Sequence, residues 1–565
     1  MKSNTWHILL LCLLLQISFS ALKAASELHI AVADFGAIPD DGKCDAAAIR
    51  QAISSAEGKE NIIISFESGV YNLNEDAVLF RKNYKAMLFV WGQKNWMLKG
   101  AVDEQGNPAT TLEMNLCLGN QITGASHLDI RDNENIKVTN FILDQNPRFA
   151  TAAKVLEVND DHWVTIEVFE GMPHFDGMQT HSANNWDLET GQLIKGPPIT
   201  IAMTLGEKHV FTKVEGYKRR YEIQSKRFAS LLKPGEGLSF HFNVIAGKAR
   251  TVDVYNNTDV ELNNIFVHNA IGMILGGGSN KNMTFRKFHI KPEGKSLAVG
   301  PRDGIHLARN SGRLLMEDVL VKGVRWDPLV SYLGFVSITN RIDDQSILLD
   351  GQSDKQQLAL EAIQPGDYLK FWVGEKPMKN KVVQVQDGKI TLADKLSPEV
   401  LQGTYFSPEA WYWEEAIIKN CLVESNYGTG LVYECDNLLV ENSTFRNNSY
   451  ADIGLGPTSK NVGAFCENIL IRNNLFEGST WIDKYKNYRG SITTFHKSPF
   501  FDKEPYHQNI HIENNTFKDI TGPEKPSAIH IKNASEVTIR QNKYINTDNT
   551  VLVEEASTTR IIVKD

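Results

Sequence analysis

Two short segments of the sequence concentrate side chains that could carry out chemistry. The first contains Asp303, and the second contains Asp327, 24 positions later. If the chain coils with a repeat near 23 residues, two carboxylates at this spacing lie on adjacent turns, about 5 Å apart at the backbone. Paired carboxylates across a sugar are what glycoside hydrolysis requires, because one protonates the leaving oxygen while the other activates water or attacks. The alternative is that both are solvated aspartates in turns.

The neighbours of both aspartates suit contact with a sugar. Trp326 precedes Asp327, and the C–H groups of a pyranose pack on flat aromatic rings. An arginine precedes Asp303, and another lies two positions before Asp327; each could neutralise the carboxylates or bind a sulfate or uronate group. We predict Asp303 and Asp327 as catalytic residues, and predict as substrate-binding residues Arg302, His306, Arg325, Trp326 and Tyr332.

The sequence contains no motif for serine-hydrolase, zinc-dependent or nucleotide chemistry. It contains no G-x-S-x-G, no H-E-x-x-H, no P-loop and no His/Cys cluster at zinc spacing, so we predict no cofactor and no metal. A lyase would need a basic residue and commonly Ca²⁺ held by several carboxylates, and no tight acidic cluster of that kind occurs. The formal charge of −9, without a basic run, argues against nucleic acid as a partner.

A repeated strand pattern must position these residues. Short runs of alternating apolar and polar residues lead into an Asn turn, and comparable positions recur after 23, 31 or 41 residues. Repeats of this length made of strands without regular helices predict a parallel β-helix. Asn suits the corners because it tolerates the left-handed conformation and can bond the turn of the next coil. The pattern occurs at 136–141, 260–265, 440–445, 471–476, 512–517 and 539–544.

A capping helix and two inserts complete the expected architecture. Asp45 is a good N-cap, and Ile49 and Ile53 form an apolar stripe, so a helix here would cover the open first coil. The Asn rhythm is interrupted at 154–248 and at 334–410, where strands with hairpin spacing predict two small β-barrels or β-sandwiches. We expect these inserts to form walls on either side of the site.

The N-terminus predicts export. Lys2 and the apolar run 8–15 are typical of a secretory signal peptide, so we expect a periplasmic or secreted protein. No later segment approaches 18 consecutive apolar residues, and no membrane span is predicted. The predicted organisation is 1–24 signal peptide, 25–153 N-terminal coils with the cap, 154–248 first insert, 249–333 central coils with the active site, 334–410 second insert, and 411–565 C-terminal coils.

Several segments together resemble a known family. The opening motif around 34–53 is similar to that of pectin-lyase-like carbohydrate enzymes, which form right-handed parallel β-helices. The segments 251–256, 302–307, 310–312 and 507–517 resemble glycoside hydrolase family 110, the exo-acting α-1,3-galactosidases. The resemblance covers most of the mature chain. It implies an all-β fold with two barrel inserts, and a catalytic-site aspartate at Asp303 preceding His306.

The second segment differs from that family. Where the family has paired aspartates followed by Ala-x-Asn-x-His-Gly, this chain has Trp326 and Asp327 followed by 328–334. The general-acid role then falls to Asp327, to Glu434 or to another carboxylate, and Glu434 joins the predicted substrate-binding residues. The resemblance implies an inverting exo-glycosidase that removes terminal α-linked galactose or a related sugar from polysaccharides or oligosaccharides. The alternatives are a non-catalytic glycan-binding β-helix and a polysaccharide lyase.

Overall fold

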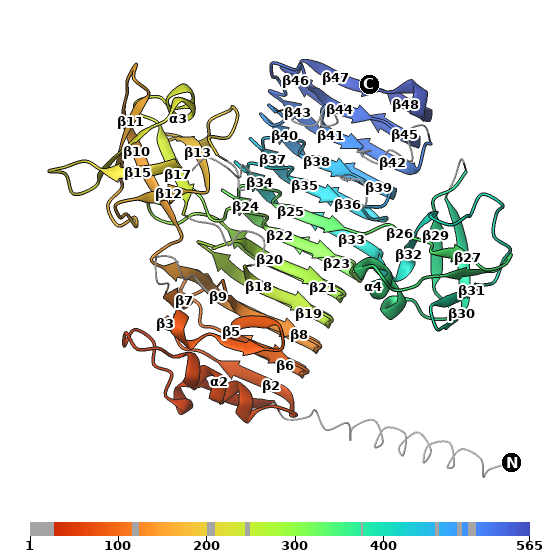
Figure 1. Cartoon of the computed structure of the whole chain (residues 1–565), viewed down its shortest axis with the longest axis horizontal. Helices are drawn as coiled ribbons and strands as arrows, with labels where there is room; N and C mark the ends of the chain where they lie inside the picture. The colour runs from red at the N-terminus through yellow and green to blue at the C-terminus, as the bar shows by residue number, and fades with distance from the viewer. Residues whose placement is uncertain are drawn as a thin grey trace, which may run out of the picture.

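The computed structural model describes residues 27–115, 124–200, 209–242, 249–374, 377–457, 463–482, 489–494 and 504–564. The predicted signal peptide, 1–24, lies outside this part of the chain. The described residues form a long stack of β-coils with two β-rich inserts on opposite sides (Figure 1). The predicted parallel β-helix is therefore confirmed. No helix in the described ranges is long and apolar enough to cross a membrane.

One large parallel sheet runs along the whole stack, from β1 to β48. Its strands are β1 (Leu28–Ala31), β2 (Glu60–Ser65), β3 (Gly69–Asn74), β6 (Lys94–Lys99), β7 (Thr110–Asn115), β9 (Glu134–Asn146), β19 (Thr258–Val267), β21 (Lys281–Ile290), β23 (Ser311–Glu317), β24 (Leu320–Lys322), β33 (Trp413–Lys419), β34 (Leu422–Glu424), β36 (Leu438–Glu441), β37 (Thr444–Arg446), β39 (Glu467–Arg472), β40 (Leu475–Glu477), β42 (His507–Glu513), β43 (Thr516–Lys518), β45 (Ala534–Arg540), β46 (Lys543–Ile545) and β48 (Thr558–Lys564).

A second sheet, which carries the predicted site, is parallel apart from its first hairpin, β4–β5. Its strands are β4 (Leu79–Arg81), β5 (Tyr84–Trp91), β8 (Ser126–Arg131), β18 (Arg250–Tyr255), β20 (Met273–Gly278), β22 (Ile305–Ala308), β25 (Leu329–Tyr332), β35 (Leu431–Tyr433), β38 (Ile453–Leu455), β41 (Gly490–Thr494), β44 (Ser527–Ile531) and β47 (Asn549–Val553).

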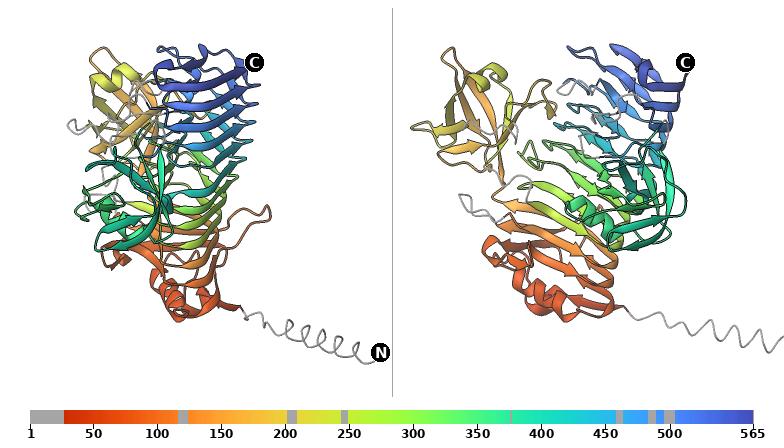
Figure 2. Two further views of the ribbon diagram at one scale, coloured as in Figure 1. Left: turned by 90° about the vertical axis from the view of Figure 1, so that its right-hand side faces the viewer. Right: turned by 45° about the vertical axis from the view of Figure 1, so that its right-hand side comes forward.

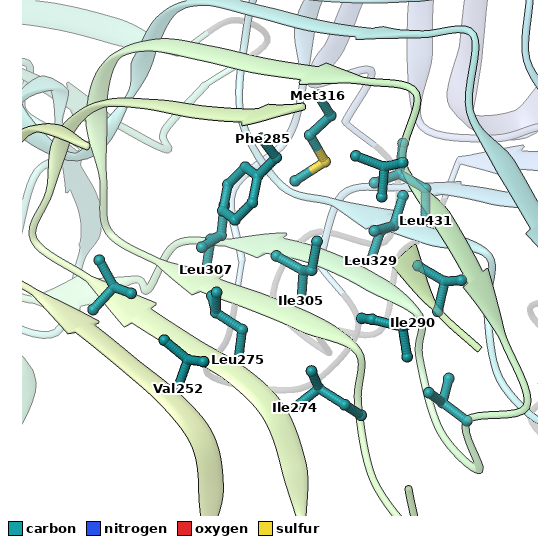
Figure 3. Packing of buried hydrophobic residues seen from close by; sticks show 14 of the residues in the cluster. Val252, Ile274, Leu275, Phe285, Ile290, Ile305, Leu307, Met316, Leu329 and Leu431 are labelled. Carbon is teal, nitrogen blue, oxygen red and sulfur yellow. The ribbon is translucent and has the colours of Figure 1, made fainter. Parts of the chain in front are cut away.

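The core runs through the middle of the coils. Parallel pairing in register stacks like residues, so that Leu275, Ile305, Leu329 and Leu431 follow one another and all point inward (Figure 3). Because successive residues of a strand face opposite sides, the residue after each of these faces outward. In β22 that outward residue is His306.

Asparagines stabilise the corners, as the sequence predicted. Asn473 and Asn514 adopt left-handed backbone, with φ of 58° and 57°. The buried side chain of Asn474 donates to Asn515 Oδ1 at 3.0 Å, and Asn515 donates in turn to Asn542 Oδ1 at 3.1 Å. Each side chain thus satisfies the polar groups of the next corner, which would otherwise be buried without partners.

Helix α2 (Ala46–Ser55) covers the first coil, with Ile49 and Ile53 buried beneath it. Asp45 takes the N-cap position, but its carboxylate accepts no hydrogen bond from the helix. It accepts instead from the backbone N–H groups of Ile38 and Asn72, at 3.0 and 2.9 Å. The expected cap residue therefore ties the helix to a loop and to β3.

Both inserts are antiparallel, and both project from the stack (Figure 2). The first contains α3 (Lys226–Leu231) and strands β10 (Ala150–Val158), β11 (Trp163–Val168), β12 (Met178–Thr180), β13 (Ser182–Asp187), β14 (Gln192–Leu193), β15 (His209–Lys213), β16 (Arg220–Gln224) and β17 (Gly237–His241). The second contains α4 (Asp354–Ala362) and strands β26 (Val336–Ser337), β27 (Asn340–Arg341), β28 (Ser346–Leu348), β29 (Tyr368–Phe371), β30 (Met378–Gln386), β31 (Lys389–Leu392) and β32 (Tyr405–Pro408).

Candidate active site

The two predicted aspartates lie on adjacent coils. Asp303 is in the turn before β22, and Asp327 is in the turn before β25, the next strand of the sheet. The backbone N–H of Gly304 donates to the carbonyl oxygen of Asp327 at 3.1 Å, which places the two turns side by side. The spacing of 24 residues therefore corresponds to one coil, as the sequence predicted.

Asp303 forms a pair with His306. The aspartate is buried, with 2% of its surface exposed, and its Oδ2 lies 2.8 Å from Nδ1 of His306. With its proton on Nδ1, the imidazole donates to the carboxylate and fixes its orientation. The ring of Tyr332 meets the His306 ring edge-on, with 4.9 Å between centroids. Three predicted site residues thus lie together in contact.

Asp327 lies in an environment that disfavours its charged form. Protein surrounds its carboxyl group, although part of the residue still faces solvent, and this burial raises its pKa from 3.8 to about 7. The nearby carboxylate of Asp303 adds to the rise, while the hydrogen bond from the backbone N–H of Thr429, at 2.7 Å, and the charge of Arg302 oppose it. Near neutral pH, Asp327 can therefore carry a proton that it is able to give up.

Arg302 and Trp326 lie beside the aspartates. The guanidinium carbon of Arg302 is 5.8 Å from the centroid of the Trp326 ring. Both residues are half-buried, and within the described ranges Nε of Arg302 has no hydrogen-bond partner. An aromatic ring and an unused donor next to two carboxylates are a suitable environment for a sugar.

Arg325 corrects one of the sequence predictions. Its side chain is buried, with Nε donating to Oδ1 of Asn184 at 2.8 Å and a terminal nitrogen donating to the carbonyl of Ser239 at 2.5 Å. It also contacts Nδ1 of His241, and burial lowers its pKa to about 9. Because all these partners belong to the first insert, Arg325 attaches that insert to the β-helix and does not face a substrate.

The first insert also brings a histidine that sequence reasoning missed. Burial lowers the pKa of His181 to about 4, and the positive charges of Arg325 and Arg302 contribute to the shift. His181 is therefore a neutral imidazole close to Arg302 at physiological pH. It belongs to no motif and precedes Asp303 by more than a hundred residues, so nothing in the local sequence indicated its position.

Glu434 does not join the aspartates. It is fully buried just after β35, beside the end of β25, whereas Asp327 precedes the start of β25. Its backbone N–H donates to the carbonyl of Ser331 at 2.9 Å, and its negative charge opposes the lowering of the pKa of Lys355, in α4 of the second insert. The expectation that Glu434 could act as the general acid beside Asp303 is therefore wrong.

Comparisons with known proteins agree with this fold. Residues 409–564 match a family model described as a right-handed beta helix region. The chain is 22% identical over 522 residues to alpha-1,3-galactosidase B of Akkermansia muciniphila, covering 87% of this chain and 63% of that protein. It is 23% identical over 457 residues to alpha-1,3-galactosidase B of Parabacteroides distasonis, covering 73% and 70%. The chain thus spans less than two thirds of the A. muciniphila enzyme.

Two solved structures align along most of the chain. The A-module of Azotobacter vinelandii mannuronan C-5 epimerase AlgE4 has a TM-score of 0.41 at 11% identity, covering 94% of this chain and 99% of that one. An exopolygalacturonase from Thermotoga maritima has a TM-score of 0.36 at 11% identity, covering 95% and 92%. The predicted resemblance to α-1,3-galactosidases is confirmed, at low identity, by the sequence matches.

Proposed function

We propose that this divergent relative of α-1,3-galactosidases is an exported, exo-acting glycoside hydrolase that removes terminal α-linked galactose or a related sugar from polysaccharides or oligosaccharides. The similarity to galactosidases supports the reaction class, and the signal-like residues 1–24 support export. The observation that carries the proposal is the pair of carboxyl groups on adjacent coils. One is held by a histidine, and the other has a pKa of about 7.

The two carboxyl groups suit different steps. Asp327, protonated near neutral pH, would give its proton to the glycosidic oxygen as the bond to the sugar breaks. Asp303, hydrogen-bonded to His306, would take a proton from the water that attacks the anomeric carbon. We infer that attack occurs on the face opposite the leaving group, which inverts the anomeric configuration. Restoring the starting state requires one proton to return from Asp303 to Asp327 through solvent.

The terminal sugar would lie on the side of the first insert. Trp326 supplies an aromatic surface and Arg302 a donor, while neutral His181 lies nearby. Arg325 holds the insert in place from beneath. We infer that the first insert closes one end of the site, which supports exo-action because a sugar chain could then extend in only one direction.

The test is hydrolysis of α-1,3-linked galactosides, followed by NMR. Inversion predicts that β-galactose is released first. Asp303→Asn should lower kcat by about 10²- to 10⁴-fold, the usual contribution of an acid–base group. The matched control is Asp318→Asn, which alters another aspartate paired with a histidine: its Oδ1 lies 3.5 Å from His289, and the side chain is 61% exposed. Unchanged turnover in Asp303→Asn would sink the assignment, and α-galactose as the first product would exclude inversion.

A further inference from the structure

The strand next to the aspartate pair has unusual outward residues. In β20 these are Gly276 and Gly278, which lie in register between Asp253 and Tyr255 of β18 and His306 and Ala308 of β22. Outward positions of a strand normally carry side chains, and glycine weakens a strand interior. Two glycines on the outward face of one coil therefore indicate that something lies close against it.

Side chains from the preceding coil occupy that space. A Cβ atom on Gly276 would clash with the Arg250 side chain, and one on Gly278 would lie 3.0 Å from a ring carbon of Tyr255. Arg250 and Tyr255 are thus folded over β20 toward the coil that carries His306. Glycine at both positions allows them to lie flat there.

Arg250 is held firmly, yet it retains donor capacity. One terminal nitrogen donates to Oδ1 of Asp253 at 2.8 Å. Asp253 is fixed in turn by the hydroxyl of Ser126, at 2.5 Å, and by Arg131, 3.9 Å away. Nε of Arg250 is buried, while 31% of the side chain remains exposed, so a ligand would meet the exposed part of the side chain and not Nε. A preorganised guanidinium with unused donors suits a hydroxyl-rich ligand.

Tyr332 links this cluster to the aspartate pair. Its ring contacts His306 edge-on, and it lies close enough to Arg250 and Tyr255 to influence the pKa of both. Arg250, Tyr255, Tyr332 and His306 thus surround the small residues of β20 and β22. Because His306 binds Asp303, the cluster is continuous with the proposed catalytic site.

We propose that Arg250, Tyr255 and Tyr332 form a subsite for the second sugar of the glycan, on the leaving-group side of the scissile bond. This inference rests on the proposed function and adds a direction: the glycan extends from the aspartate pair along the strands, over Gly278 and Ala308, which lie in register between Tyr255 and Tyr332. The tyrosine rings would pack against C–H groups of the pyranose, and Arg250 would donate to its hydroxyls.

The charges around Arg250 are paired. Arg250 is paired with Asp253, and the neighbouring Arg131 donates to Asp129 at 2.6 Å. Two arginines and two aspartates balance each other around Arg250, while Arg309 adds a positive charge 6.0 Å from the centroid of the Tyr332 ring. The alternative direction leads along β25 toward Glu434 and Lys355, where the second insert lies.

The test compares two substrates in the same variant. Arg250→Gln should lower kcat/KM for an α-1,3-galactosyl disaccharide by about ten- to a hundredfold, the value of a charge-assisted hydrogen bond. The loss on α-galactosyl fluoride, which carries no second sugar, should be at least tenfold smaller. The control is Arg220→Gln, which removes an arginine in an equivalent setting: its guanidinium lies 4.1 Å from the ring of Tyr217 and 3.5 Å from Glu167. It should change neither substrate's rate.

Three outcomes would overturn the subsite. Equal losses on both substrates in Arg250→Gln would show a structural or catalytic effect. A selective loss on the disaccharide in Lys355→Gln, with none in Arg250→Gln, would reverse the direction of the glycan. If Arg250→Gln does not fold, Tyr255→Phe and Arg250→Lys must show the selective loss instead, and the absence of such a loss in both would refute the proposal.

Calorimetric titration separates this inference from the proposed function. An α-1,3-galactosyl trisaccharide should bind Asp303→Asn protein at least tenfold more tightly than galactose does, and adding Arg250→Gln should remove the difference. That result without any hydrolysis by the wild type would leave the subsite standing while the glycosidase assignment fails. Equal affinity for the trisaccharide and galactose would refute the subsite even in an active enzyme.

Discussion

Replacing Asp327 with asparagine should stabilise the protein at alkaline pH. The folded state raises the pKa of this carboxyl from 3.8 to about 7. A group with a raised folded-state pKa stabilises the fold while both states are protonated, and this contribution is lost as pH rises from about 4 through 7. Three pKa units at about 1.4 kcal/mol each give about 4 kcal/mol as an upper value, because part of the residue faces solvent.

The corresponding shift in melting temperature can be worked out. The unfolding entropy is about 2.1 cal/mol/K per residue, so the unfolding entropy of a chain of 565 residues is about 1.2 kcal/mol/K if the chain unfolds as one unit. A gain of 4 kcal/mol then corresponds to about 3 °C. Asparagine keeps an oxygen that can accept the hydrogen bond from Thr429, so the packing around the site should be preserved.

The assay is thermal unfolding of the wild type and Asp327→Asn from pH 4 to 8.5. We expect equal melting temperatures near pH 4 and an advantage of up to about 3 °C for the variant above pH 7.5. The Asp318→Asn control should show no gain in melting temperature that appears only at high pH. A difference independent of pH, or a wild type that melts higher at pH 8, would refute the raised pKa. In the wild type, glycosidase activity should also decline above pH 7 as Asp327 loses its proton.

Two further predictions concern the scaffold. Asn280→Ala removes hydrogen bonds of 2.9 Å to the carbonyl of Val254 and to Oδ1 of Asn310, and should lower the free energy of unfolding by about 3 kcal/mol. The melting temperature should then fall by about 2 to 3 °C, and an unchanged value would show that these hydrogen bonds contribute little. Lys370→Met leaves the buried carboxyl of Asp436, now 3.0 Å from the ammonium, without its partner, and should cost about 3 to 5 kcal/mol. Lys370 lies in β29 of the second insert and Asp436 lies in the β-helix, so limited proteolysis should then cut this insert faster, and adding Asp436→Asn should slow the cleavage again; equal rates in all three proteins would show that this pair does not fix the insert to the β-helix.

The repeated parts of the molecule could be predicted from sequence. The sequence of each coil indicates its structure, because an alternating strand leads into an asparagine such as Asn473 or Asn514, a residue type that tolerates the left-handed backbone of the corner. The same periodicity placed Asp303 and Asp327 on adjacent coils, since the separation along the chain equals one repeat. Where the repeat is regular, the spacing of two residues along the chain therefore predicts their positions in the fold.

Contacts across the inserts could not be predicted in the same way. The local sequence predicts Arg325 as a site residue because it is close to Asp327, but its hydrogen-bond partner Asn184 is 141 positions away in the first insert. Glu434 is separated from Asp327 by the whole second insert, and only the strand pairing shows that it lies at the far end of β25. His181 reaches the site through the same docking of the first insert. These positions depend on how the inserts pack against the β-helix, and the repeat pattern of the sequence does not predict that packing.

The hydrogen bond from Thr429 to Asp327 has a consequence for the order of folding. The two residues are 102 positions apart, and the second insert lies between them. On the ribosome, Asp327 emerges long before the coil that holds its carboxyl, so the N-terminal coils can stack while this carboxyl is still unrestrained. Closing so long a loop costs only about 0.6 kcal/mol more than closing one half its length, so the insert delays this closure at little energetic cost. The proposed acid would be set in place only once the chain beyond the second insert has been made, so under the proposed mechanism a nascent, half-built chain would be inactive.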